Sequence, residues 1–216
     1  VGCVIRKSGR DFLGYWYLLG SLAGMGSALT CWLVLSVLLR HTRGALVLDL
    51  PNQRSLHTQP TPKGGGVVIV GIIILASGSL MWFLPGTDRI FAALGISALG
   101  FGALGWWDDH HSLPVRRKLL VEFAVGMIVV WLIDLPRELQ FSGLAILELS
   151  PFLATPVAIL WIIWMTNLYN FMDGVDGLVA SQAIISSIVL AGWFLLYKDV
   201  GMALFCLALA GAGIGF

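Results

Sequence analysis

The chain has 216 residues, of which 58% are apolar and only 12% are charged, and its mean hydropathy is +0.89. This composition excludes an ordinary soluble domain and favours a protein embedded in a lipid bilayer. The formal net charge of +1 excludes nucleic-acid binding driven by bulk charge, because such binding needs many cationic side chains to meet the phosphates.

Apolar runs long enough to cross a bilayer recur along the whole chain. A helical span requires about 20 apolar residues. We predict seven spans, at Phe12 to Leu39, Gly64 to Thr87, Ile90 to Trp107, Leu119 to Ile133, Leu149 to Met172, Gly177 to Tyr197 and Val200 to Phe216. The fourth is the shortest and contains Glu122 within its first turn. The predicted fold is an all-α, polytopic membrane bundle of about seven helices.

The connections between these spans fall into two groups. Residues 40–63, 108–118 and 173–176 are rich in charged and amide side chains, whereas the other connections are mixed in sign. With seven spans in order, the three rich connections share one face of the membrane. The first two contain the basic residues Arg40, Arg43, Arg54, Lys63, Arg116, Arg117 and Lys118. The positive-inside rule places this face in the cytoplasm, although the basic amino-terminal tail favours the opposite orientation.

The first rich connection combines prolines and basic side chains with three consecutive glycines at residues 64–66. Glycines at the start of a span leave backbone N–H groups uncovered near a helix N-terminus, where phosphate binds well. Arg54 and Lys63 would add charge-assisted contacts, and His57 would bind phosphate or a base edge. Taken without the other two connections, this segment is interpreted as a basic cytoplasmic linker.

The second rich connection begins with two adjacent carboxylates, Asp108 and Asp109, directly after an apolar span. Such carboxylates repel each other, and nearby hydrocarbon raises the cost of their ionisation, so a cation is expected beside them. A solvated helix end is the alternative interpretation. The basic residues 116–118 that follow would contact either lipid headgroups or a diphosphate.

In the third rich connection, polar side chains recur every third residue at Asn167, Asn170, Asp173 and Asp176. On a helix or at its end they would form one stripe that faces protein or water. Their hard oxygen atoms suit Mg²⁺. A polar helix end with a glycine turn is the alternative, but amides within a span are costly unless they serve a function. Together the three connections indicate a phosphoryl-transfer site.

Three motifs carry a resemblance to a known family. They are the Asp-Asp pair after the third span, the Asn-x-x-Asn-x-x-Asp-Gly-x-Asp-Gly-Leu stretch over residues 167–178, and the Pro-Asn-x-Arg-Ser-x-His-x-x-Pro-Thr-Pro-Lys-Gly-Gly-Gly loop over residues 51–66. The chain resembles the polyprenyl-phosphate N-acetylhexosamine-1-phosphate transferases of glycosyltransferase family 4, over roughly residues 40–216. These enzymes begin peptidoglycan-lipid and O-antigen synthesis.

The resemblance implies magnesium-dependent transfer, with manganese as an alternative ion, of N-acetylhexosamine 1-phosphate from UDP-GlcNAc or UDP-FucNAc to undecaprenyl phosphate, releasing UMP. It implies a bacterial inner-membrane location with cytoplasmic loops, and leaves a homodimer open. Asp108 and Asp109 would be catalytic, as base or covalent nucleophile, and would bind the metal with Asp173 and Asp176. The donor and its phosphates would contact Asn52, Arg54, His57, Lys63, Gly64, Gly65, Lys118, Asn167, Asn170 and Asp173.

Lys63 stands where the peptidoglycan enzymes tend to have Met, so the resemblance favours the O-antigen branch. A muramoyl-pentapeptide donor is the alternative within the family. An ion-coupled transporter is the alternative from another class, but it predicts acids near mid-membrane, whereas here the acids other than Glu122 lie at span ends.

Residues 1–216 are expected to form a single membrane-embedded catalytic domain, truncated at the C-terminus. The family's further acidic loop and its His-rich loop would lie beyond Phe216. A fragment that only binds lipid phosphate is therefore a further alternative.

Overall fold

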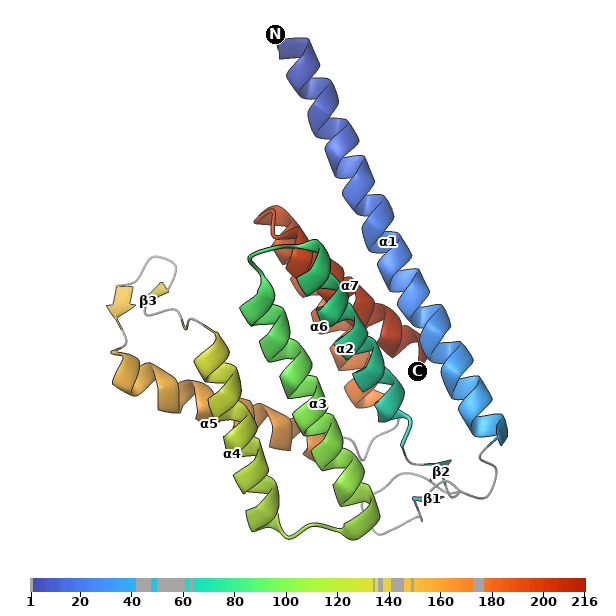
Figure 1. Cartoon of the computed structure of the whole chain (residues 1–216), viewed down its shortest axis with the longest axis vertical. Helices are drawn as coiled ribbons and strands as arrows, with labels where there is room; N and C mark the ends of the chain where they lie inside the picture. The colour runs from blue at the N-terminus through green and yellow to red at the C-terminus, as the bar shows by residue number, and fades with distance from the viewer. Residues whose placement is uncertain are drawn as a thin grey trace.

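A computed structural model describes the backbone of residues 2–41, 48–49, 61–62, 64–133, 135, 138–140, 146–148, 150–172 and 177–216, and the side chains of residues 18–40, 64–133, 135, 150, 152–172 and 177–216. This part of the chain contains seven helices, arranged as in Figure 1. They are α1 (Gly2–His41), α2 (Gly66–Phe83), α3 (Asp88–His111), α4 (Val115–Leu132), α5 (Pro151–Met172), α6 (Leu178–Leu196) and α7 (Val200–Gly215).

Two short antiparallel strand pairs lie in the connections. The strand β1 (Leu48–Asp49) pairs with β2 (Thr61–Pro62) between α1 and α2, and β3 (Glu138–Gln140) pairs with β4 (Ile146–Glu148) between α4 and α5. The helices follow the predicted spans in number and order. The prediction of an all-α, polytopic bundle is therefore confirmed.

Five helices of the described chain are long and apolar enough to cross a membrane, namely Leu18–Arg40 within α1, α2, α3, Phe152–Met172 within α5, and α6. The helix α4 differs because it carries Arg116, Arg117, Lys118 and Glu122 in its first two turns, and charges are costly in hydrocarbon. The helix α7 is apolar but has only 16 residues. Together these helices make a multi-pass membrane protein.

The helix ends that flank the three polar connections lie on one side of the molecule. In Figure 1, the C-terminal ends of α1, α3 and α5 and the first turns of α2, α4 and α6 all lie in the lower part of the view. The helix α3 has 24 residues and α2 has 18, so α3 extends past the start of α2 at this end.

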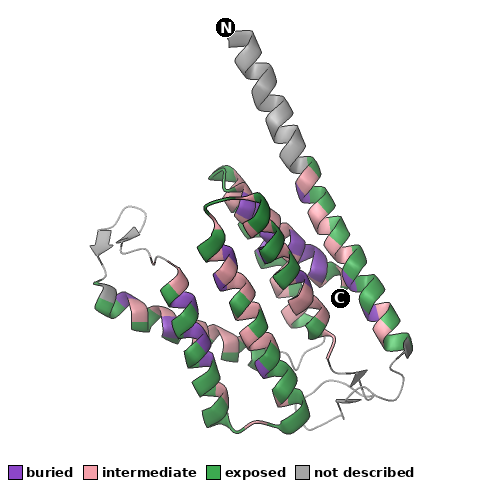
Figure 2. Cartoon of the chain, in the orientation of Figure 1, coloured by how far each residue is buried: buried purple, intermediate pink, exposed green. Residues whose placement is uncertain are grey.

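The helix α7 forms the centre of one packing region, where it contacts α1, α2 and α6. Figure 2 shows that buried positions are concentrated on α7, and they include Phe205, Cys206 and Ala212. A buried cluster of Cys31, Leu35, Ile72 and Ala212 joins α1, α2 and α7. Small residues on α7 let the neighbouring helices approach closely, which is how membrane helices associate without a hydrophobic driving force.

A second packing region joins α3, α4 and α5. Ala93 of α3 and Val125 and Val129 of α4 are buried together, and Phe101 of α3 and Ile162 of α5 pack against them. This apolar cluster lies further along the same helices, away from their polar ends, and fixes α4 against both of its neighbours. It thereby positions the polar residues described next.

Candidate active site

The connection between α3 and α4 is much shorter than the sequence predicted. Residues 108–118 were expected to form a polar loop, but α3 continues to His111 and α4 begins at Val115, so Asp108 and Asp109 lie in the last turn of a helix. Ser112 ends α3 in the left-handed conformation, with φ 46° and ψ 70°, and its N–H donates to the Asp108 carbonyl at 2.9 Å. Pro114, with φ −64° and ψ 142°, is the N-cap of α4 and directly precedes its first residue, Val115.

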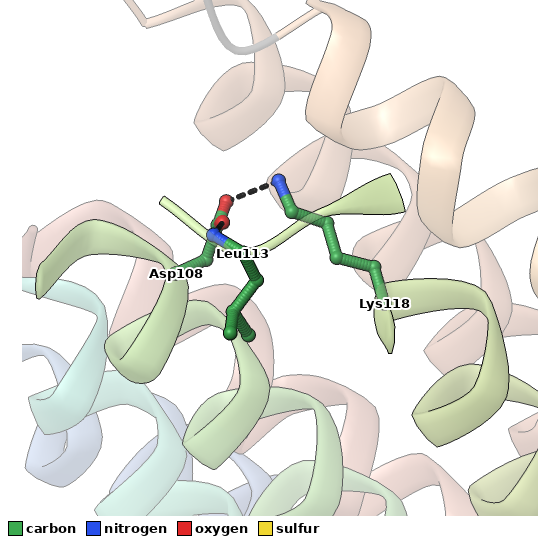
Figure 3. Close-up of polar contacts among 3 residues, drawn as sticks. All are labelled: Asp108, Leu113 and Lys118. Atoms are coloured by element: carbon green, nitrogen blue, oxygen red, sulfur yellow. Dashed lines mark hydrogen bonds and ion pairs between the residues drawn. The ribbon is translucent and has the colours of Figure 1, made fainter. Parts of the chain in front are cut away.

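This tight turn brings the Asp108 carboxylate to the Lys118 ammonium. As Figure 3 shows, Asp108 Oδ2 accepts a charge-assisted hydrogen bond from Lys118 Nζ at 2.5 Å, and Oδ1 accepts one from the Leu113 N–H at 2.9 Å. The two side chains are 27% and 25% exposed. Both carboxylate oxygens therefore have a protein donor, and the carboxylate is held in one orientation at the mouth of the turn.

A polar depression surrounds this pair. It has a volume of about 250 Å³ and is lined by Asp108, Asp109, Ser112, Leu113 and Lys118. A water molecule occupies about 30 Å³ of liquid, so the depression can hold a hydrated ion or a phosphate group. Two aspartates, a serine and a lysine line one small space at the end of α3, and these residue types could bind a cation and a phosphate together.

Aromatic residues anchor this end of α3. Trp106 and Trp107 are more than half exposed one turn before His110 and His111, which suits a position at the membrane surface. His110 Nδ1 lies 2.7 Å from the Trp106 carbonyl oxygen. Because a carbonyl only accepts, Nδ1 carries the proton there. Sequence reasoning missed His110 and Ser112, although both lie within four residues of Asp108.

A second polar contact joins α4 to α5. Glu122, four residues after Lys118 on α4, is only 4% exposed, and its Oε2 accepts a hydrogen bond from Asn167 Nδ2 at 2.6 Å. Asn170 lies one turn further along α5 and is exposed. From the sequence, Glu122 was noted only as the acid that does not lie at a span end. Its partner could not be identified there, because Asn167 lies 45 residues away.

The remaining predicted residues are divided between described and undescribed parts of the chain. Gly64 has φ 100°, which favours glycine, and Gly65 is the N-cap of α2 with no side-chain cap. A Cβ on Gly65 would lie 2.7 Å from the Phe216 ring, so this glycine also serves close packing. The predicted residues that lie outside the described chain are Asn52, Arg54, His57, Lys63, Asp173 and Asp176.

The structure therefore brings Asp108, Asp109 and Lys118 into one depression and places Asn167 against α4. Among the described side chains, no three His, Cys, Asp or Glu residues form a metal-binding group. The predicted metal set combines the α3 pair with Asp173 and Asp176, which follow directly after the last turn of α5. Its completeness thus depends on residues outside the described chain.

Comparison with known proteins identifies the family. Residues 91–216 match the profile of Glycosyl transferase family 4. A phospho-N-acetylmuramoyl-pentapeptide-transferase of Synechococcus sp. (strain JA-3-3Ab) is 30% identical over 209 residues, which cover 90% of this chain and 58% of the relative. A probable undecaprenyl-phosphate N-acetylglucosaminyl 1-phosphate transferase of Bacillus subtilis (strain 168) is 29% identical over 166 residues, covering 74% of this chain and 44% of the relative.

The chain thus spans about half the length of these curated relatives. The region that matches the family covers more than half of the chain and contains Asp108, Lys118 and Asn167. The resemblance carried by the three motifs is confirmed, and the chain belongs to glycosyl transferase family 4.

Proposed function

We propose that this chain carries the catalytic face of a membrane enzyme that transfers a sugar 1-phosphate from a nucleotide sugar to a polyprenyl phosphate. The observation that supports it most directly is the Asp108–Lys118 pair, beside Asp109, in a polar depression at the end of a membrane helix. A lipid phosphate and a soluble nucleotide can both reach such a place, because it lies where hydrocarbon meets water.

The reaction requires one bond to form and one to break. A phosphate oxygen of the lipid attacks the phosphorus that bears the sugar, the bridge between the two phosphates of the donor breaks, and UMP leaves. Lys118 has three donors and can contact Asp108 and a substrate phosphate at once. In this single displacement, Asp108 or Asp109 acts as the base toward the lipid phosphate. In the covalent alternative, one of these carboxylates attacks the phosphorus first and UMP leaves, and the lipid phosphate then displaces the carboxylate in a second step.

A divalent cation fits the donors of this depression. The carboxylates of Asp108 and Asp109 and the hydroxyl of Ser112 are hard oxygen ligands, which Mg²⁺ prefers and Mn²⁺ accepts. Asp108 and Asp109 would hold the ion together with Asp173 and Asp176. When bound, the ion supplies charge neutralisation for the diphosphate of the donor.

The acceptor and location follow from the same features. We propose undecaprenyl phosphate as acceptor, because the Bacillus subtilis relative is named for it. The proposed location is the bacterial inner membrane with the depression facing the cytoplasm, since the exposed Arg116 and Arg117 flank it on the side that the positive-inside rule assigns.

Two donors are candidates. The proposed donor is UDP-GlcNAc or UDP-FucNAc, on the resemblance of the loop that contains Lys63. The second candidate, a UDP-muramoyl-pentapeptide, is favoured by the names of several relatives, including one of Granulibacter bethesdensis (strain ATCC BAA-1260 / CGDNIH1) that is 31% identical over 202 residues. Relatives named for either donor have similar identity, so identity alone does not choose between them.

Membranes that contain the full-length protein, incubated with undecaprenyl phosphate, Mg²⁺ and a panel of labelled UDP-sugars, test reaction class and donor together. We expect UMP release and a lipid-linked product with UDP-GlcNAc or UDP-FucNAc. Asp108→Asn removes the carboxylate charge and should lower turnover by at least about 100-fold, the usual cost of losing one electrostatic contact in a transition state. A product with the pentapeptide donor alone would support the second candidate.

Asp199→Asn is the matched control. Asp199 caps α7, in the connection from α6 that does not contribute to the depression, and its Oδ1 accepts from the Met202 N–H at 3.1 Å. Asparagine caps helices as well as aspartate does, so this variant should keep wild-type turnover. Equal turnover in Asp108→Asn and wild type would reject the site.

A further inference from the structure

Glu122 is a buried acid that the proposed reaction does not use. It lies in the second turn of α4, is 4% exposed, and faces α5 rather than the depression around Asp108. Acids within the membrane are costly, and they are usually retained for function with a specific partner. The partner here is Asn167, whose Nδ2 donates to Glu122 Oε2 at 2.6 Å.

This contact fixes how the Asn167 amide is turned. Its Nδ2 donates both to Glu122 Oε2 and to the Ile163 carbonyl oxygen, at 2.6 and 2.9 Å. Both partners are acceptors, so the opposite orientation would set the amide oxygen against two other oxygens. With both amide hydrogens used, Asn167 presents its Oδ1 as an acceptor. Asn167 is an exposed residue in spite of these bonds, so the protein around it does not cover it completely.

The Glu122–Asn167 contact lies near the end of the helices where the proposed site is. Glu122 of α4 contacts Asn167 of α5. Gly126, one turn later on α4, lies beside Ile159, which comes eight residues earlier on α5, because a Cβ on Gly126 would lie 3.5 Å from Ile159 Cγ2. The two helices therefore run in opposite senses, and the first turn of α4 lies toward the last turn of α5. Lys118, one turn before Glu122, holds Asp108 at that same end.

We propose that Glu122 is a positioning residue for the nucleotide sugar. It holds the Asn167 amide so that Oδ1 accepts a hydrogen bond from an N–H or O–H group of the donor, and it links this contact through α4 to Lys118. The proposal rests on the proposed function. The competing explanation is that the Glu122–Asn167 bond only joins two membrane helices, as polar side chains often do.

Substitutions at Glu122 separate these explanations through the KM for the donor. Glu122→Met keeps the length and removes the acceptor, so it should raise KM about tenfold while kcat stays within about threefold, as expected when a binding contact is lost. Glu122→Gln keeps an acceptor oxygen, and its KM should stay within about threefold of wild type.

Asn167→Ala should raise KM as much as Glu122→Met does. The double variant Glu122→Met with Asn167→Ala should have the same KM as Asn167→Ala alone, because both substitutions remove one contact.

Thr166→Val is the matched control, because its hydroxyl bonds the Ile162 carbonyl of its own helix and it neighbours Asn167. It should leave KM unchanged. If Glu122→Met does not accumulate in membranes, the pair of substitutions Asn167→Asp and Glu122→Gln tests the contact instead, because it exchanges the donor and the acceptor. Asn167→Asp sets its carboxylate against both Glu122 and the Ile163 carbonyl oxygen and should raise KM about tenfold. Adding Glu122→Gln restores a donor on the Glu122 side and should lower that KM by at least about threefold, although the Ile163 carbonyl still faces an oxygen.

The outcomes are distinct. A rise in donor KM with rescue by the conservative variants supports the positioning role. A normal donor KM in Glu122→Met overturns it, even if the unfolding temperature is lower. It is also overturned if adding Glu122→Gln does not lower the donor KM of Asn167→Asp. Wild-type protein that releases no UMP from any UDP-sugar rejects the proposed function and the positioning role together, whereas an active wild type with unchanged Glu122 variants rejects the positioning role alone.

Discussion

Two helix interfaces of this protein are held together by different means. Between α1 and α7 the backbones themselves meet, because a Cβ on Gly211 would lie 2.0 Å from the Gly24 carbonyl oxygen and one on Gly215 would lie 2.1 Å from that of Ala28. Between α3, α4 and α5, polar side chains meet near the helix ends, and apolar side chains meet further along the helices.

The difference teaches where function and stability are separable. Lipid chains are as apolar as the helices, so close van der Waals contact and hydrogen bonds replace the hydrophobic effect as the cause of association. At its glycines, the α1–α7 interface is held by close van der Waals contact alone. The α3–α4–α5 region also has hydrogen bonds, and these lie beside the proposed site. Substitutions at the glycines should therefore change stability, and substitutions at the polar contacts should chiefly change activity.

The largest expected effect is at Gly211. Gly211→Val places a branched side chain where the Gly24 carbonyl lies and forces α1 away from α7. We expect a loss of about 3 kcal/mol in the free energy of unfolding, at the upper end of the usual cost of overpacking. Denaturation in mixed detergent micelles, followed by tryptophan fluorescence, measures it.

Gly192→Val is the control for this substitution, since a Cβ at Gly192 of α6 has no neighbour within 4 Å. It introduces the same side chain into a helix without a close contact, so its unfolding should differ little from wild type. Similar destabilisation in both variants would show that α1 and α7 are not joined through close backbone approach.

The next largest effect is on activity and not on stability. Lys118→Met removes the partner of Asp108, and we expect kcat/KM for the nucleotide sugar to fall about 100-fold. The free energy of unfolding should change by less than about 1 kcal/mol, because partly exposed ion pairs contribute little to stability. Lys198→Met, in the connection between α6 and α7, is the control and should keep wild-type kinetics. A Lys118→Met protein with full activity would separate this ion pair from the reaction.

The helices were predictable because their signal is local. The length of an apolar run sets a membrane span directly, so all seven helices were found in order. The boundaries at the proposed site were less predictable. The third span was predicted to end at Trp107 and the fourth to begin at Leu119, but α3 extends to His111 and α4 begins at Val115. Charged residues at a span end have no apolar signal, although they continue the helix.

The contacts of the site were only partly predictable for a related reason. Asp108 and Lys118 were both identified from their types, and their separation of ten residues made a contact across one turn easy to form. Glu122 and Asn167 lie on different helices, and only the packing of α4 on α5 selects that pairing. A sequence shows that a buried acid needs a partner, but the tertiary structure decides which one.

The smallest expected effect concerns a polar residue in an otherwise apolar contact. Ser77 of α2 is buried against Gly95 of α3, and its hydroxyl has no hydrogen-bond partner among the described residues. Burial of an unpaired hydroxyl costs free energy, so Ser77→Ala should leave stability unchanged or raise it by up to about 1 kcal/mol. Ser79→Ala is the control, because the Ser79 hydroxyl is bonded to the Leu75 carbonyl at 2.7 Å on an exposed part of the same helix. If Ser77→Ala instead destabilises the protein by more than about 1 kcal/mol, its hydroxyl makes a bond that matters. The α2–α3 contact would then depend on hydrogen bonding, as α4 and α5 do, and not on small side chains that allow close approach.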